Sequence, residues 1–262
     1  MKPKLAILVI SCDKYSDLWE QYFKLFSKFW PDCEFKIYLL SNHLLFKNIN
    51  INVSTILIGE DISWSGNLIK AVTKIDEDYI FALIDDFFII EEIAIGKILE
   101  VLDIMIKEEI NFINIGGFKR PDKYYNKYFG AIEKGSIYRA TTMALWRKEI
   151  LLKILKEGEN AWDFEIYGSN RSNKYDKFYS TYDKLIKTIN VIDKGSWDPR
   201  SIKKLLEFGV NLDLSKRPIK SKPELLILKL LEIRVYLFKT FVPFRYQAFI
   251  KNKLSRMTYL SK

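Results

Sequence analysis

Two adjacent carboxylates follow one of the most apolar stretches of the chain. Asp85 and Asp86 come directly after Tyr-Ile-Phe-Ala-Leu-Ile at positions 79–84. Burying an unpaired charge is costly, so such a pair needs a partner. Mg²⁺ and Mn²⁺ take oxygen ligands and often bind through one or two carboxylates plus substrate phosphates. A solvated turn or an N-cap pair would account for the same residues, but their position after a fully apolar strand favours a metal bridging to a diphosphate.

A second acidic group lies at Trp162-Asp163-Phe164-Glu165, at a predicted loop-to-helix junction. A positioned carboxylate can accept the proton of an acceptor hydroxyl, and an apolar neighbour raises its pKa towards the useful range. Trp162 could stack on a sugar face. Acids in a first helical turn also complement the helix dipole, and the residues alone slightly favour that plainer interpretation.

Two further segments could contact phosphate. Ser63-Trp-Ser-Gly-Asn67 predicts a capped helix start, whose backbone N–H groups suit phosphate or ribose. Lys194-Gly-Ser-Trp197 follows a predicted strand, and its lysine could neutralise a leaving diphosphate. A simple helix start is the better explanation of the first segment taken alone, and a plain turn explains the second equally well. His43 is the only histidine and has no recognisable nucleophile motif beside it, so we interpret it as structural.

Strand and helix patterns alternate along the first half of the chain. Short continuous apolar runs suit parallel strands that are covered on both faces, and apolar residues at helical spacing suit the covering helices. The predicted strands are Leu5–Ile10, Phe35–Leu40, Asn52–Ile58, Tyr79–Ile84 and Asn111–Ile115, and the predicted helices are Asp17–Phe29, Gly66–Ile75 with Ser65 as N-cap, and Ile93–Lys107. This alternation predicts an α/β fold with a mostly parallel sheet and helices on both faces.

Ligands of such sheets bind beyond the carboxyl ends of the strands. The polar residues that follow the predicted strands should therefore gather at one edge: Ser11, Asp13, Ser41, Asn42, Asp85 and Asp86. Further along, we predict a loop or short-strand insertion at 118–135, a strand at Ser136–Ala144, a helix at Trp146–Glu157 and a last short strand at Thr188–Asp193.

The length, net charge and cysteine content narrow the class of protein. A length of 262 residues suits one large domain with an appendage, and the net charge of +9 attracts phosphate. Nucleic acid is not the first choice, because Arg-rich runs and zinc-finger spacing are both missing. Cys12 and Cys33 suit reduced cytosolic thiols. The apolar run Leu5–Ile10 is too short for a signal peptide, and the chain offers no stretch of about 18–20 apolar residues that would predict a membrane span.

The composition changes from Ser215 onwards. SKRPIKSKP predicts a basic, proline-punctuated linker, and Glu224–Phe241 and Arg245–Arg256 predict two basic helices, the first amphipathic. We therefore expect a catalytic domain at 1–212 and a helical tail at 213–262. Such a tail can lie on an anionic membrane surface; a helical cap on the catalytic domain or a dimer contact is an equally good interpretation.

The order of these segments resembles that of the GT-A glycosyltransferases. LAILVISCD resembles their first nucleotide-binding strand, WSGNLIKAVTKI the helix before the metal-binding strand, and YIFALIDDFFI the strand that carries an Asp-x-Asp type motif. SIYRATTMALWRKEIL followed by WDFEI resembles the acceptor half with its catalytic acid. The resemblance covers roughly residues 4–200 and is closest to small bacterial enzymes of surface-polysaccharide assembly.

The resemblance implies transfer of a sugar from a nucleotide-sugar donor to a hydroxyl of a glycan or lipid-linked acceptor, with inversion. It implies an enzyme in the cytoplasm or at the inner face of the cell membrane. Asp86, with Asp85, would bind Mn²⁺ or Mg²⁺ and the donor diphosphate. Glu165 would be the general base, with Asp163 the alternative, and Trp162 would bind the acceptor. The expected donor-binding residues are Ser11, Asp13 (near the nucleobase), Trp64, Ser65, Asn67, Asp85 and Lys194.

The chain departs from the family pattern in two places. The acidic pair is followed by Phe87 instead of forming Asp-x-Asp, and no histidine is available near the C-terminal end as a metal ligand, so Lys194 or Arg200 could supply positive charge instead. A nucleotidyltransferase would share the acids and the sheet, but it usually needs a glycine-rich loop after the first strand, and SCDKYSD has no glycine. A non-catalytic protein that binds a membrane surface or a partner is the other alternative.

Overall fold

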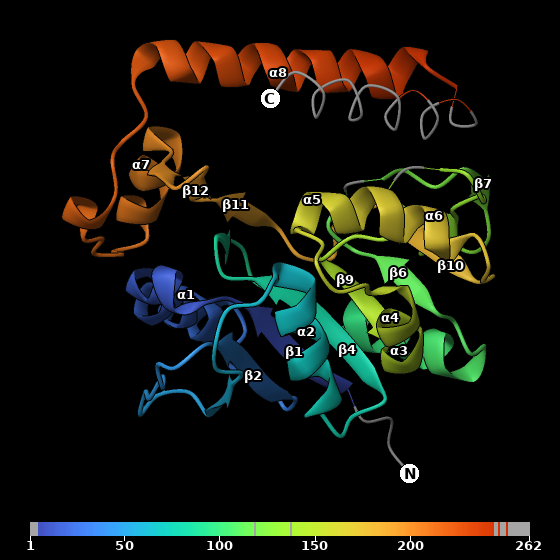
Figure 1. Ribbon diagram of the computed structural model, residues 1–262, viewed down its shortest axis with the longest axis horizontal. Coiled ribbons are helices and arrows are strands. Elements are labelled where there is room, and N and C mark those ends of the chain that lie inside the picture. Colours follow the sequence, from blue (N-terminus) through green and yellow to red (C-terminus); the bar gives the residue numbers. More distant parts are fainter. Residues whose placement is uncertain (1–4, 118, 137, 244–245, 247–249, 251–262) are drawn as a thin grey trace.

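A nine-stranded sheet forms the centre of the computed structural model, which describes residues 5–117, 119–136, 138–243, 246 and 250 (Figure 1). From one edge to the other its strands are β3 (Val53–Leu57), β2 (Lys36–Ser41), β1 (Leu5–Ile10), β4 (Tyr79–Ile84), β9 (Ala144–Arg147), β6 (Phe112–Asn114), β10 (Phe178–Thr181), β8 (Phe129–Ala131) and β7 (Lys123–Tyr124).

The sheet is mostly parallel. Strands β3, β2, β1 and β4 pair in parallel, β6 pairs in parallel with β10, and β9 lies antiparallel between β4 and β6. In the register of β1 and β4, Ile10 lies opposite Ile84. The residues that follow these two strands, Ser11 and Asp85, therefore emerge side by side at one edge.

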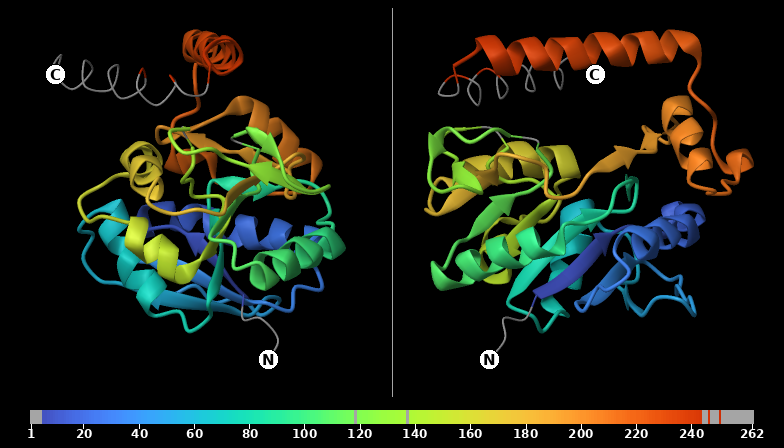
Figure 2. Two further views of the ribbon diagram at one scale, coloured as in Figure 1. Left: turned by 90° about the vertical axis from the view of Figure 1, so that its right-hand side faces the viewer. Right: turned by 180° about the vertical axis from the view of Figure 1, so that it is seen from behind.

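Helices cover both faces of the sheet (Figure 2). Alternate residues of β1 belong to different cores: Leu5, Ile7 and Val9 face one side and Ala6, Leu8 and Ile10 the other. The first side packs against α1 (Ser16–Phe29), α3 (Ile95–Lys107) and α7 (Pro199–Glu207). The second packs against α2 (Trp64–Thr73) and α4 (Lys148–Ile154). Because each face is covered, the central strands are apolar throughout, as the sequence predicts.

Two predictions about individual elements are wrong. The N-cap of α2 is Ser63, whose Oγ accepts from the Gly66 backbone N–H, so the helix starts earlier than Ser65 allows. The strand expected at Ser136–Ala144 begins only at Ala144. The preceding residues are held by loop contacts, such as the hydrogen bond from the Ala140 N–H to Ser169 Oγ, and make no strand ladder. Since β9 takes Ala144–Arg147, the following helix α4 is confined to Lys148–Ile154.

A small second sheet lies beyond the carboxyl edge of the large one. β5 (Phe87–Ile89) pairs antiparallel with β11 (Thr188–Asn190), and a hairpin of β12 (Ile192–Asp193) and β13 (Ser196–Trp197) follows. The strand predicted at Thr188–Asp193 is therefore divided between β11 and β12. These elements return the chain to the acidic turn between β4 and β5.

The C-terminal part leaves the domain as one long helix. After a short turn, η3 (Leu214–Lys216), and an extended stretch, α8 (Lys222–Phe241) lies above the rest of the molecule (Figures 1 and 2). Its start is fixed by a capping box between Ser221 and Glu224. None of the described helices is both long and apolar enough to cross a membrane. The second helix predicted at Arg245–Arg256 falls outside the described residues, apart from Tyr246 and Ile250.

Candidate functional site

The acidic turn between β4 and β5 lies at the carboxyl edge of the parallel strands. Asp85 continues the ladder with one more bond, from its N–H to the Ile10 carbonyl at 3.3 Å. Its side chain is 3% exposed and accepts a short hydrogen bond from Ser11 Oγ, which itself accepts from Trp19 Nε1 at 2.7 Å. The predicted meeting of Ser11 with the acidic pair is thus what the structure shows.

Burial, followed by the neighbouring charge of Asp86, raises the pKa of Asp85 well above its usual range. The hydrogen bond from Ser11 works against this rise but does not cancel it. Asp85 therefore points into the protein and has its own protein partner. It is the less suited of the two acids to contact a ligand directly.

Asp86 has a different environment. Its backbone carbonyl accepts from the Val191 N–H at 2.8 Å, and its carboxylate Oδ1 is buried with no hydrogen-bond partner among the described residues. Burial and the nearby charge of Asp193 raise the pKa of Asp86 to about 7. An unpartnered buried carboxylate oxygen is unusual in proteins and calls for an explanation such as an ion or a ligand.

Two cations from the C-terminal part reach this turn, and sequence reasoning missed both. Lys220 is 8% exposed, and its Nζ lies 3.0 Å from Asp193 Oδ2. Arg217 forms a two-pronged ion pair with Asp17, at 2.8 and 2.6 Å, and its charge lowers the pKa values of Asp85 and Asp86 in part. The sequence assigned both residues to a basic linker; only their anchoring by distant residues reveals their place.

The loop after β2 is organised by Asp13. Its carboxylate accepts from the backbone N–H groups of Asn42, His43 and Leu44 at 2.9–3.2 Å and from Ser41 Oγ at 2.7 Å. Burial acts to raise the pKa of Asp13, but these hydrogen bonds outweigh it and hold the pKa below its usual value. Asp13 thus lies at the predicted edge, and its side chain shapes the loop. His43 is exposed there, with Nε2 3.8 Å from Glu60 Oε1.

Asp61, two residues before the N-cap of α2, lies near Cys12, which follows β1. Burial raises the pKa of the Cys12 thiol, and the charges of Asp85 and Asp61 add to this rise. The predicted donor residues of α2 are engaged by protein contacts. Ser65 Oγ accepts from the Glu159 N–H, and Asn67 Nδ2 donates to Asp61. The Trp64 ring packs 5.5 Å from the Phe164 ring. These side chains therefore position loops, and the structure does not gather them around the acidic turn.

The remaining predicted cations lie elsewhere around the hairpin. Lys194 occupies its tip with a positive φ of 52° and is exposed. Arg200 pairs with Asp198 at the start of α7, at 2.7 Å. Lys220, and not Lys194, is the buried lysine next to the acidic turn.

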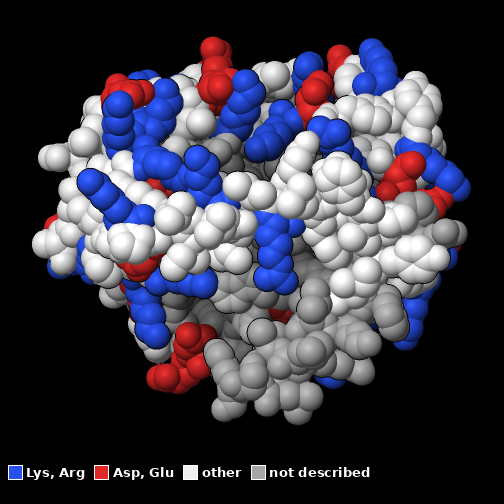
Figure 3. Space-filling view, turned by 90° about the horizontal axis from the view of Figure 1, so that it is seen from above, with Lys and Arg blue, Asp and Glu red and all other residues white. Residues whose placement is uncertain are grey.

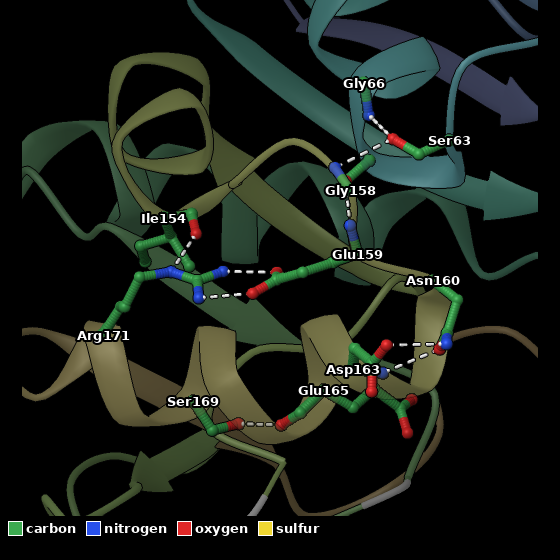
Figure 4. Close-up of polar contacts among 11 residues, drawn as sticks. Ser63, Gly66, Ile154, Gly158, Glu159, Asn160, Asp163, Glu165, Ser169 and Arg171 are labelled. Carbon is green, nitrogen blue, oxygen red and sulfur yellow. Dashed lines mark hydrogen bonds and ion pairs between the residues drawn. The ribbon is translucent and has the colours of Figure 1, made fainter.

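The second acidic group lies on a segment that is tied to the start of α2 (Figure 4). Ser63 Oγ accepts from the Gly158 N–H, and Arg171 binds Glu159 through two bonds of 2.7 and 2.6 Å. This frame leads into α5 (Ala161–Asp163) and a π-helical turn at Phe164–Gly168. Single π-helical turns occur frequently at functional sites.

Asp163 and Glu165 extend from this segment away from the Glu159–Arg171 pair (Figure 4). Asp163 is committed to the helix start, because its Oδ2 accepts from Asn160 Nδ2 at 2.7 Å and its N–H donates to Asn160 Oδ1. Glu165 lies in the π-helical turn and is partly exposed. Trp162 is 70% exposed, so it is accessible to a ligand.

The raised pKa of Asp86 makes the stability of the folded chain depend on pH. Because the folded chain holds the proton of Asp86 more tightly than the unfolded chain does, ionisation of Asp86 lowers stability progressively from about pH 4 to about pH 7. We expect Asp86→Asn to raise the free energy of unfolding by about 1–3 kcal/mol at pH 8 and to have little effect near pH 4, as measured by urea denaturation. An equal effect at both pH values would contradict the assignment of a raised pKa.

Comparisons with known proteins support the fold. No family model matches the chain, and no curated protein matches it in sequence. A UTP-bound UGPase from Acinetobacter baumannii superimposes with a TM-score of 0.50 at 11% identity, over 87% of this chain and 99% of that one. A mannosyltransferase from Pyrobaculum calidifontis in complex with GDP-Man and Mn²⁺ gives 0.49 at 11% identity, over 96% and 87%. TarS from S. aureus gives 0.47 at 10% identity, over 93% of this chain but only 46% of TarS. The chain has an α/β fold similar to that of the UGPase, with a large, mostly parallel central sheet.

Proposed function

We propose that the chain is a glycosyltransferase that takes a sugar from a nucleotide-sugar donor and passes it to a hydroxyl of a glycan or lipid-linked acceptor. The observation that carries the proposal is the Asp86 carboxylate. Its Oδ1 is buried and unpartnered among the described residues, at the sheet edge where ligands of such folds bind. A donor diphosphate with a divalent cation would supply the missing partner. Assembly of bacterial surface polysaccharide is the proposed setting.

The residues present fit Mg²⁺ or Mn²⁺ bound jointly by protein and substrate. Among the described residues, no group of three or more His, Cys, Asp or Glu is arranged to hold a metal alone. A site with one or two carboxylates is typical of ions that keep water and substrate phosphate as their other ligands. Asp86 would hold the ion, with Asp85 behind it, and the ion would neutralise charge on the leaving diphosphate.

The local charge balance also favours a cation. Four carboxylates, those of Asp17, Asp85, Asp86 and Asp193, surround the turn, whereas Arg217 and Lys220 supply two positive charges. An excess of acids in a buried place is costly unless protons or a cation compensate it. Burial raises the pKa of Asp86, which favours a proton as the compensation before a cation binds.

Glu165 is the proposed general base. It lies in the π-helical turn close to the exposed Trp162, on the segment that is fixed to α2. In an inverting displacement a carboxylate accepts the proton of the acceptor hydroxyl as that oxygen attacks the sugar carbon. Trp162 would offer an apolar surface to the acceptor.

The nucleotidyltransferase alternative is less well supported by the loop after β1. Only Ser11 and Cys12 separate β1 from the short helix η1 (Asp13–Tyr15), which continues into α1. This connection is short and has no glycine, so it lacks the phosphate-cradling loop expected of that class. The UGPase likeness concerns the fold and is compatible with either activity.

The donor site is testable by nucleotide binding. We expect one or more sugar nucleotides, in a panel tested with Mn²⁺, to raise the melting temperature, and we expect slow hydrolysis of that donor. Asp86→Ala should weaken binding of the donor at least about 10-fold, because a charge-assisted contact is lost. The measurement is calorimetric titration at pH 8.

Asp103→Ala is the matched control, because Asp103 is exposed on α3 and lies outside the site. Absence of any nucleotide binding, or equal binding by Asp86→Ala and wild type, would refute the glycosyltransferase proposal. Release of pyrophosphate from a nucleoside triphosphate and a sugar phosphate would establish the nucleotidyltransferase instead.

The general base is testable by comparing two isosteric variants. Glu165→Gln should lower kcat by about 10²–10⁴-fold while donor affinity stays unchanged, since it replaces the proton-accepting carboxylate with a neutral amide of the same shape. Asp163→Asn should change kcat much less and chiefly lower the melting temperature, because the Asn160 contact is disturbed. Steady-state rates with a fixed donor concentration decide between them, and the reverse ranking would assign the base to Asp163.

We propose that α8 lies on an anionic membrane surface. Leu226, Leu230, Ile233, Leu237 and Phe241 recur at helical spacing and are 46–75% exposed. By helical position Lys222, Lys229 and Arg234 flank this row, and Glu224 lies on the opposite side. The face that carries α8 shows more basic than acidic side chains (Figure 3). Apolar contact flanked by cations suits negatively charged lipid headgroups.

Vesicle flotation tests this placement. We expect the chain to bind vesicles that contain phosphatidylglycerol more tightly than neutral vesicles, and Leu230→Glu to reduce binding at least about 5-fold. Leu206→Glu is the control, because Leu206 is 58% exposed, as is Leu230, but lies on α7. Equal flotation of all variants would contradict the proposal. A dimer that Leu230→Glu dissociates would show that α8 serves self-association instead.

A further inference from the structure

The chain between Arg217 and Lys220 is held against the β12–β13 hairpin by backbone contacts. The Trp197 N–H donates to the Pro218 carbonyl at 2.8 Å, and the Lys220 N–H donates to the Trp197 carbonyl at 3.0 Å. Ile219 and Trp197 form a parallel bridge. Trp197 is itself only 1% exposed, so the segment is fixed to a residue of the core. Figure 1 shows the extended chain between this region and α8.

Arg217 fixes the upstream end of the same segment. Besides its ion pair with Asp17, its Nη2 donates to the Lys14 carbonyl at 2.6 Å, and its guanidinium lies 4.5 Å from the centre of the Tyr15 ring. The Arg217 and Asp17 side chains are only 11% and 15% exposed. Contacts with residues about 200 positions earlier in the sequence therefore hold the segment in place, so it is no free linker.

This anchoring places the Lys220 ammonium group against Asp193, an acid close to the turn. Lys220 is buried, and its Nζ contacts Asp193, whose charge acts on Asp86. Burying a lysine is costly, and an ammonium carries three N–H donors, whereas the ion pair with Asp193 Oδ2 does not have hydrogen-bond geometry. A lysine that served only as a surface counter-ion for Asp193 would not need this burial.

We propose that Lys220 is a donor-binding residue that contacts the diphosphate of the nucleotide sugar, and that Arg217 positions it through the anchored segment. The inference rests on the proposed function, since it concerns the same donor site. The ligand class is a nucleoside diphosphate: its phosphate oxygens accept from the ammonium, and the lysine stabilises the charge that develops as the sugar–phosphate bond breaks. The catalytic unit then extends through Lys220, beyond the boundary at 212 expected from composition.

The test compares how variants bind UDP or GDP, whichever wild type prefers, with how they bind the corresponding nucleoside monophosphate, at pH 8 with Mn²⁺. Lys220→Met should weaken diphosphate binding about 10- to 100-fold and monophosphate binding much less. Lys220→Arg should recover part of the loss because it keeps a donor and the charge. Lys216→Met and Lys222→Met, at exposed positions on either side, should bind as wild type does.

A double variant separates contact with the ligand from simple neutralisation of Asp193 and also guards against misfolding. Lys220→Met/Asp193→Asn removes both members of the buried pair, so it should fold with a wild-type melting temperature or a higher one. If Lys220 contacts phosphate, the double variant still loses diphosphate binding. Recovery of binding in the double variant, or wild-type binding by Lys220→Met, would overturn the role of Lys220 alone. Failure of wild type to bind any nucleotide would overturn the proposed function as well.

Discussion

The fold depends on one electrostatic constraint: carboxylates must be kept in a poorly hydrated turn at the end of a buried strand. β4 is covered on both faces, so the chain that leaves it has little access to water, and two acids stand at that point. Their pKa values rise because the ionised forms lose hydration. Ser11, the segment that contains Arg217 and Lys220, and the β5–β11 sheet can all be understood as responses to this constraint.

The two acids differ in whether the protein supplies a partner for the carboxylate. Asp85 turns inward and is bound by Ser11, which is in turn held by Trp19, so it is part of the scaffold. Asp86 keeps an oxygen without a partner among the described residues. One acid of the pair is thus satisfied by the protein, and the other is not.

The sequence predicted well those features of the fold that depend on residues close together along the chain. The bounds of Leu5–Ile10 and Tyr79–Ile84 agree with β1 and β4, because a run buried on both faces leaves a continuous apolar signal. The gathering of Ser11, Asp13 and Asp85 at one edge followed from parallel topology alone. The strand at Ala144–Arg147 was misplaced because its buried polar neighbours, such as Thr141 and Thr142, resemble strand residues although loop contacts hold them.

What the sequence could not predict depends on contacts between distant residues. Arg217 and Lys220 belong to a lysine- and proline-rich stretch whose composition is typical of a linker, and only the pairing of Arg217 with Asp17 and of Lys220 with Trp197 shows otherwise. The contacts of Ser65 and Asn67 could not be foreseen either. The sequence suggested that these side chains contact a ligand, but in the structure Ser65 contacts Glu159 and Asn67 contacts Asp61. Pro218, which restricts the backbone next to Arg217, is the one local signal of an ordered segment.

The position of Lys220 also links the site to the exposed helix. Only Ser221 separates this buried lysine from α8, and Ser221 is fixed by the capping box with Glu224. The backbone bond between Lys220 and Trp197 therefore fixes the point from which α8 starts. The start of α8 is therefore held close to the acidic turn, although composition assigns the two to different domains.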